Sequence, residues 1–120
     1  MKTVTRDDIL SMGASFNGAA IHLESLQGFS ISAFWTDAGA SLEGTLTIQG
    51  SNNAFMDNTG NQENPSAVWD DLPGFLAIVD GSGSFFWNIA DVYFKAARIK
   101  WERAAGSGTL TAYIYAKGWV

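Results

Sequence analysis

The residues that could perform nucleophilic catalysis or bind a transition metal are few in this sequence. His22 is its only histidine and cysteine is absent, so a base-activated Ser or Thr nucleophile would depend on His22 alone, and a closed zinc site cannot be built from the usual residues. By alternation His22 shares a strand face with Glu24, which is an ordinary surface pairing. We therefore expect no catalytic residue, no cofactor and no metal ligand, and predict that the protein is not an enzyme.

Carboxylates are the remaining candidates for chemistry, because glycoside hydrolysis needs only a pair of them. Four aspartates fall at expected turns or strand ends, where aspartate is common for conformational reasons, and spacing alone pairs none of them. These are Asp70, Asp71, Asp80 and Asp91. Residues 57–63 place oxygen ligands at alternate positions, as calcium loops do, but they do not match the EF-hand pattern. Calcium binding by this segment stays open.

Two glycine-rich segments, residues 81–84 and 106–109, resemble phosphate-binding loops only in composition. Both nucleotide-binding fingerprints require a helix N-terminus directly after the glycines. Here strands are expected on both sides, so we interpret these segments as turns between strands.

Exposed aromatic residues are better candidates, and they point to binding. Tyr113 and Tyr115 fall on the outward face of an expected strand. They could be anchors of a protein interface, platforms for stacking a sugar, or cross-strand packing partners. Trp119, near the end of the chain, is either tucked back or presented to a neighbour.

Residues 51–66 interrupt the strand pattern and predict a long surface loop rich in Asn and Gly. Its two large apolar residues, Phe55 and Met56, join Tyr113, Tyr115 and Trp119 as the candidate interaction surface. Loops of this length in compact domains are often functional, although a variable solvated excursion is the alternative.

The elements that must position these residues are β-strands, because apolar and polar residues alternate along much of the chain. The clearest alternation covers residues 29–35, 44–49, 97–102 and 109–115, and less regular strands are expected at 20–26, 75–79 and 85–92. Each clear strand has one dry and one wet face, as in antiparallel sheets packed face to face. We predict an all-β fold: an antiparallel, jelly-roll-like β-sandwich of about seven or eight strands.

The expected organisation is one β-sandwich domain over residues 19–120, preceded by an N-terminal segment over residues 1–18. Residues 5–8 could cap a single helical turn that runs to Ser11, or the segment could be an extended arm that orders against a neighbour. Trp69, which opens the run Trp-Asp-Asp-Leu, is expected to plug one end of the sandwich.

Composition favours protein contacts over other partners. The chain has 120 residues, of which 47% are apolar and 16% charged, and its formal net charge is −5. A surface so poor in charge is easily desolvated, as interfaces require, whereas the net negative charge disfavours nucleic acid and anionic membranes. The first residues lack an apolar h-region, so we expect synthesis in a cytoplasm without a signal peptide.

A succession of strand-and-turn phrases adds a resemblance. The phrases are FWTDAGA (34–40), GTLTIQGSN (44–52), VWDDL (68–72), FWNIADV (86–92), ARIKW (97–101), GSGTLTA (106–112) and AKG (116–118). Together they resemble the small jelly-roll or discoidin-like β-sandwich structural proteins of bacteriophage virions, over residues 30–118. The resemblance implies a virion component, such as a capsid decoration, cement or other accessory protein, and carries over no binding residues.

The sequence therefore predicts a non-enzymatic virion subunit that acts through protein–protein contacts. Its expected partners are capsid proteins or neighbouring structural subunits, and further copies of itself in the assembled particle. The alternative is a carbohydrate-binding module for host attachment, which would use residues 51–66 together with nearby aromatic residues.

Overall fold

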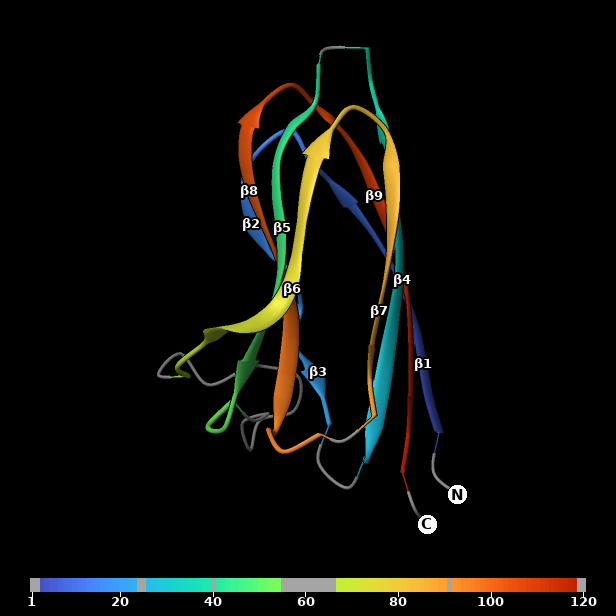
Figure 1. Ribbon diagram of the computed structural model, residues 1–120, viewed down its shortest axis with the longest axis vertical. Helices are drawn as coiled ribbons and strands as arrows, with labels where there is room; N and C mark the ends of the chain where they lie inside the picture. Colours follow the sequence, from blue (N-terminus) through green and yellow to red (C-terminus); the bar gives the residue numbers. More distant parts are fainter. Residues whose placement is uncertain (1–2, 24–25, 40, 55–66, 91, 119–120) are drawn as a thin grey trace, which may run out of the picture.

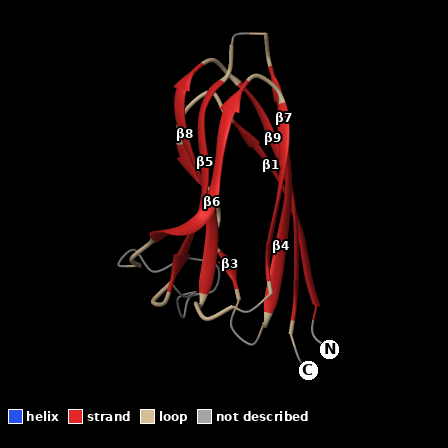
Figure 2. Cartoon of the chain, viewed as in Figure 1, coloured by secondary structure: helices blue, strands red, loops and turns tan. Residues whose placement is uncertain are grey.

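The computed structural model describes residues 3–23, 26–39, 41–54, 67–90 and 92–118. Within these segments the chain forms nine strands and no helix (Figure 1, Figure 2). The strands are β1 (Thr3–Ser11), β2 (Phe16–Asn17), β3 (Ile21–His22), β4 (Gly28–Asp37), β5 (Glu43–Ser51), β6 (Asp70–Asp80), β7 (Gly83–Ile89), β8 (Ala96–Ala105) and β9 (Gly108–Lys117).

The strands form two antiparallel sheets that face each other, as Figure 1 shows. One sheet has four strands in the order β1-β9-β4-β7. The other has five, in the order β2-β8-β5-β6 with β3 also paired to β8. This confirms the predicted antiparallel β-sandwich, with the short strands β2 and β3 bringing the number of strands to nine.

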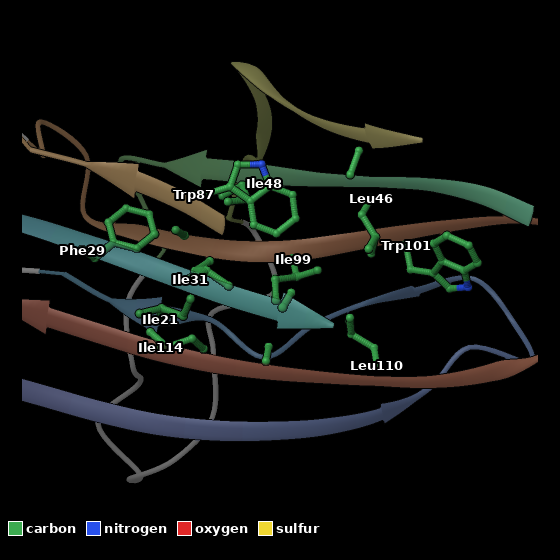
Figure 3. Packing of buried hydrophobic residues seen from close by; sticks show 14 of the residues in the cluster. Ile21, Phe29, Ile31, Leu46, Ile48, Trp87, Ile99, Trp101, Leu110 and Ile114 are labelled. Atoms are coloured by element: carbon green, nitrogen blue, oxygen red, sulfur yellow. The ribbon is translucent and has the colours of Figure 1, made fainter. Parts of the chain in front are cut away.

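The core lies between the two sheets and follows the alternation in the sequence. In β4 the buried side chains are at odd positions, from Phe29 to Trp35, and in β9 they are at even positions, from Leu110 to Ala116. Figure 3 shows that these residues meet side chains of the opposite sheet, including Ile48. Burial of such apolar surface is the main favourable term in folding.

Trp101 of β8 is the largest fully buried side chain. Its indole Nε1 donates a hydrogen bond to the carbonyl oxygen of Met12, at 3.1 Å. The indole therefore fills volume between the sheets without leaving its polar atom unsatisfied.

The N-terminal segment corrects one expectation. Residues 3–11 contain no helical turn, because they form β1, which pairs with β9 of the same chain along its full length, from Thr3 opposite Lys117 to Ser11 opposite Thr109. The extended arm expected as the alternative is thus a regular edge strand of the four-stranded sheet. Pairing with a distant strand outweighs the local capping signal at Thr5.

An inward-pointing charge occupies this edge strand. The half-buried guanidinium of Arg6 donates hydrogen bonds to the carbonyl oxygens of Ala19 and Ala20, at 3.1 and 2.8 Å, and forms an ion pair with Asp8 at 2.9 Å. Inward-pointing charges on edge strands oppose further strand pairing. The arrangement also ties β1 to the segment between β2 and β3.

Other boundaries differ from the expected ones. The strand expected over residues 20–26 is confined to β3, after which the Leu26 amide donates to the Leu23 carbonyl oxygen at 2.9 Å. The glycine-rich segments join strand to strand, as expected for turns: Gly81 and Gly106 have φ angles of 79° and 77°, a region that glycine enters without steric cost.

Candidate interaction surface

The outer face of the four-stranded sheet carries exposed apolar side chains on all four strands. In the antiparallel register, Asp7, Tyr113, Ser32 and Phe86 form one row across the sheet, so their side chains share one face. The adjacent row is formed by Ile9, Thr111, Phe34 and Ser84. We call the four large apolar members of these rows the aromatic patch: Ile9, Phe34, Phe86 and Tyr113.

Exposure within the aromatic patch is high for side chains of this kind. Phe86 is 63% exposed and Tyr113 is 47% exposed. The ring centroids of Phe34 and Tyr113 lie 6.0 Å apart and the ring planes are tilted by 34°. Two of the four members of the patch therefore pack against each other. Asp7 is the one formally charged residue in the two rows. Covering this surface with a partner would therefore desolvate little charge.

Beside the aromatic patch, the same face is hollowed towards the first residues of β4. The next row consists of Thr5, Tyr115, Ser30 and Asn88, and beyond it Lys117 lies opposite Gly28. Small residues on β4 thus lie between larger ones on β9 and β7. The result is a groove of about 540 Å³, which we call the Tyr115 groove. It is lined by Gln27, Gly28, Phe29, Ser30, Asn88, Ile89, Ala90, Tyr115, Lys117 and Gly118.

The outer face of the five-stranded sheet is organised differently. Arg98 lies 4.4 Å above the ring of Trp69 and donates through Nε to the side-chain oxygen of Gln49, at 2.8 Å. Gln49 in turn donates to a carboxylate oxygen of Asp71, at 2.9 Å. These contacts connect β8, β5 and β6 through polar side chains. Trp69 therefore packs under a guanidinium on the outer surface and does not plug one end of the sandwich as expected.

The same face carries an ion pair on β8. Lys100 Nζ lies 2.7 Å from a carboxylate oxygen of Glu102. This hydrogen bond is the main reason that the pKa of Lys100 is raised above its ordinary value. Exposed apolar side chains on this face, Leu76 and Ile78, are confined to the edge strand β6.

Comparison with known proteins finds distant structural likeness only. No protein-family model matches the chain, and no curated protein sequence matches it. The chain is similar to the crystal structure of SPBc2 prophage-derived protein YomS, with 8% sequence identity and a TM-score of 0.48, over 96% of this chain and 97% of the other. A likeness this distant indicates neither a shared function nor shared binding residues.

The structure shows where two residues of the candidate interaction surface lie. Tyr113 and Tyr115 both lie on the outer face of β9 and are 47% and 46% exposed, which confirms their predicted orientation. Phe55, Met56 and Trp119 lie outside the described residues. Residues 57–63 and Asp91 lie outside them as well. The first residues of the 51–66 loop, Ser51 to Asn53, line a second hollow of about 460 Å³. The exposed Tyr93 lines the same hollow.

Three members of the aromatic patch were not among the candidates from the sequence. Phe34 occupies an outward position of β4 and Phe86 an outward position of β7, although both are apolar. A signal for Phe34 was present, since it breaks the alternation of residues 29–35. Ile9 is not among the candidates because the sequence of its segment predicts a helical turn or an extended arm that orders against a neighbour.

Two of the residues considered for catalysis have defined places in the five-stranded sheet. His22 is half-buried on β3 opposite Ala96, and Asp71 accepts the hydrogen bond from Gln49. Within the described segments, no group of three or more His, Cys, Asp or Glu residues could hold a metal ion. In the same segments there is no helix long and apolar enough to cross a membrane.

Proposed function

We propose that this protein is a non-catalytic structural subunit of a bacteriophage particle, such as a capsid decoration, cement or other accessory protein. It docks onto a neighbouring virion protein through the aromatic patch. The observation that carries this proposal is the exposure of four large apolar side chains on one sheet face, where Asp7 is the one formally charged neighbour in their two rows. Exposed apolar side chains gathered on one face in this way are typical of interaction sites.

The geometry of the aromatic patch suits a protein partner. Its side chains project from strands that are paired within the sheet, so little backbone conformational entropy is lost when a partner binds. Phe86 is the main anchor in this account, because it is the most exposed of the three aromatic members and its ring can enter a pocket of the partner. Phe34 and Tyr113 form the neighbouring contact surface.

The assignment to a phage particle is supported by the resemblance over residues 30–118. In this proposal the chain is made in the host cytoplasm and joins the particle in several copies, in contact with capsid proteins or neighbouring subunits. It takes no cofactor and binds neither nucleic acid nor membrane, in keeping with the net charge of −5.

Co-sedimentation with phage particles tests the proposal. Particles assembled from a genome in which this gene is deleted are mixed with the purified protein and pelleted. We expect the wild-type chain to pellet with the particles and Phe86→Ser to stay in the supernatant. Ile78→Ser is the matched control, because Ile78 is similarly exposed, at 71%, but lies on the other sheet.

Two results would overturn the proposal. One is a wild-type chain that does not pellet with particles. The other is a Phe86→Ser variant that pellets as the wild type does while its thermal unfolding is unchanged. If Ile78→Ser alone lost binding, the docking face would be the outer face of the five-stranded sheet.

A further inference from the structure

The Tyr115 groove has the features of a site for a small polar ligand. Its volume of about 540 Å³ lies within the range of a few hundred to about a thousand Å³ that is usual for ligand sites. It is separate from the second hollow beside Tyr93, which shares no lining residue with it.

The sequence of β4 creates this groove. Outward positions of β4 carry Gly28 and Ser30, whereas β9 and β7 carry Tyr115 and Asn88 opposite Ser30. A Cβ atom at Gly28 would lie 2.8 Å from the carbonyl oxygen of Ile89, so a larger residue is excluded there. The backbone that follows Asn88 thus packs directly against Gly28, and the groove beside Ser30 has a tyrosine on one wall and an amide on the other.

The polar groups in the groove are available to a ligand. Within the described part of the chain, the side chains of Ser30, Asn88 and Lys117 form no hydrogen bond or ion pair. A hydroxyl, a carboxamide and an ammonium group thus surround the half-exposed ring of Tyr115. Together they offer both donors and acceptors around one apolar surface.

We propose that the Tyr115 groove binds an uncharged saccharide chain. A sugar ring presents an apolar C–H face, which packs on an aromatic ring, and hydroxyl groups, which pair with a carboxamide, a hydroxyl and an ammonium group. This fits the combination of Tyr115 with Asn88, Ser30 and Lys117. Lys117 is the one formally charged side chain that lines the groove, and a single cation does not offset the net charge of −5 enough to hold a polyanionic chain, so the proposed ligand is neutral.

An extended peptide fits this groove less well. Peptides that bind to sheets usually add a strand to an open edge, where backbone groups are unpaired. The floor of the Tyr115 groove is β4, which is paired on both sides, to β9 and to β7. It therefore offers side-chain groups to a ligand and no free backbone ladder.

NMR titration of the isolated protein tests this inference without any phage particle. The ¹⁵N-labelled chain is titrated separately with maltohexaose, cellohexaose and chitohexaose. An acidic hexagalacturonate and a proline-rich peptide serve as comparison ligands. We expect at least one neutral oligosaccharide, at millimolar concentration, to shift the amide signals of residues 27–30, 88–90 and 115–118.

Two neighbouring tyrosines provide a matched pair of variants. Tyr115→Ala is expected to weaken saccharide binding about tenfold or more, since the stacking surface is lost. Tyr113→Ala is expected to bind as the wild type does, because Tyr113 has nearly the same exposure on the same strand but does not line the groove. Asn88→Ala, which keeps the ring, should weaken binding to a smaller extent.

The inference is overturned if none of the neutral oligosaccharides shifts the groove signals, or if only the acidic chain or the peptide does so. Equal losses in Tyr113→Ala and Tyr115→Ala would also reject it, provided both variants give folded spectra. These outcomes are independent of particle docking, which is tested through Phe86.

Discussion

The two outer faces of this sandwich are built from the same alternation of inward and outward residues, but their outward side chains differ in how they are engaged. On the five-stranded sheet, outward side chains bind one another: Arg98 contacts Gln49 and Trp69, and Lys100 pairs with Glu102. On the four-stranded sheet, outward aromatic residues remain exposed to water. Apart from Leu76 and Ile78 on its edge strand, the five-stranded face satisfies its outward side chains internally, whereas the four-stranded face has exposed aromatic residues that gain free energy when a partner covers them.

The largest expected effect comes from the core that supports both faces. Trp101→Ala should lower the free energy of unfolding by about 3–5 kcal/mol, because it removes a fully buried indole from between the sheets. Urea denaturation measures this change. Tyr93→Ala, at an exposed aromatic residue, is the control and should stay within about 0.5 kcal/mol of the wild type. A similar loss in both variants would contradict the proposed packing.

The next effect separates binding from stability on the aromatic patch. Phe86→Ser should weaken particle binding by about 2 kcal/mol, or roughly thirtyfold, as expected for an anchor residue. Its free energy of unfolding should change by no more than about 0.5 kcal/mol, since the ring is mostly exposed. Quantitative pelleting and urea denaturation measure the two quantities. A variant that loses stability and binding in proportion would mean that Phe86 has a structural role.

The polar face should show the reverse behaviour. Arg98→Ala should lower the free energy of unfolding by about 1–2 kcal/mol, because the buried Gln49 loses a hydrogen-bond partner and Trp69 loses its guanidinium. Particle binding should remain at the wild-type level. Arg98→Lys keeps the charge but not the planar geometry, so it should recover only part of the stability. Unchanged stability in Arg98→Ala would argue against the network.

The smallest effect is expected at Lys100. Its pKa is raised chiefly by the hydrogen bond to Glu102, so the ion pair favours the folded state below the unfolded-state pKa of lysine. That contribution disappears as the pH rises through the higher folded-state pKa. Because Glu102 is exposed and Lys100 is only half-buried, the pair is screened by water, and Glu102→Gln should leave the urea midpoint unchanged at neutral pH. A clear shift of the midpoint would show that this pair matters more than its exposure suggests.

The fold was predictable from the sequence wherever apolar and polar residues alternate along a strand. Leu110, Ala112 and Ile114 define the inward face of β9, and this placed Tyr113 and Tyr115 correctly on the outside. Alternation is a local property, and it is strong wherever one face is dry and the other wet.

The features that could not be predicted from the sequence depend on pairing between distant segments. Ile9 reaches the aromatic patch only because β1 pairs with β9, near the other end of the chain, and no local pattern encodes that contact. Phe86 lies within the apolar run of residues 85–87, where period two cannot be recognised until β7 pairs with β4. The polar contacts of Trp69 likewise depend on Arg98, from a different strand.

Hydroxyl-radical footprinting of the protein, free and bound to phage particles, tests the central claim most directly. We predict that oxidation of Phe34, Phe86 and Tyr113 falls sharply on the particle, while the exposed Tyr93 and Ile78 react as in the free protein. Unchanged oxidation of the three aromatic residues on a particle that retains the protein would contradict docking through the aromatic patch.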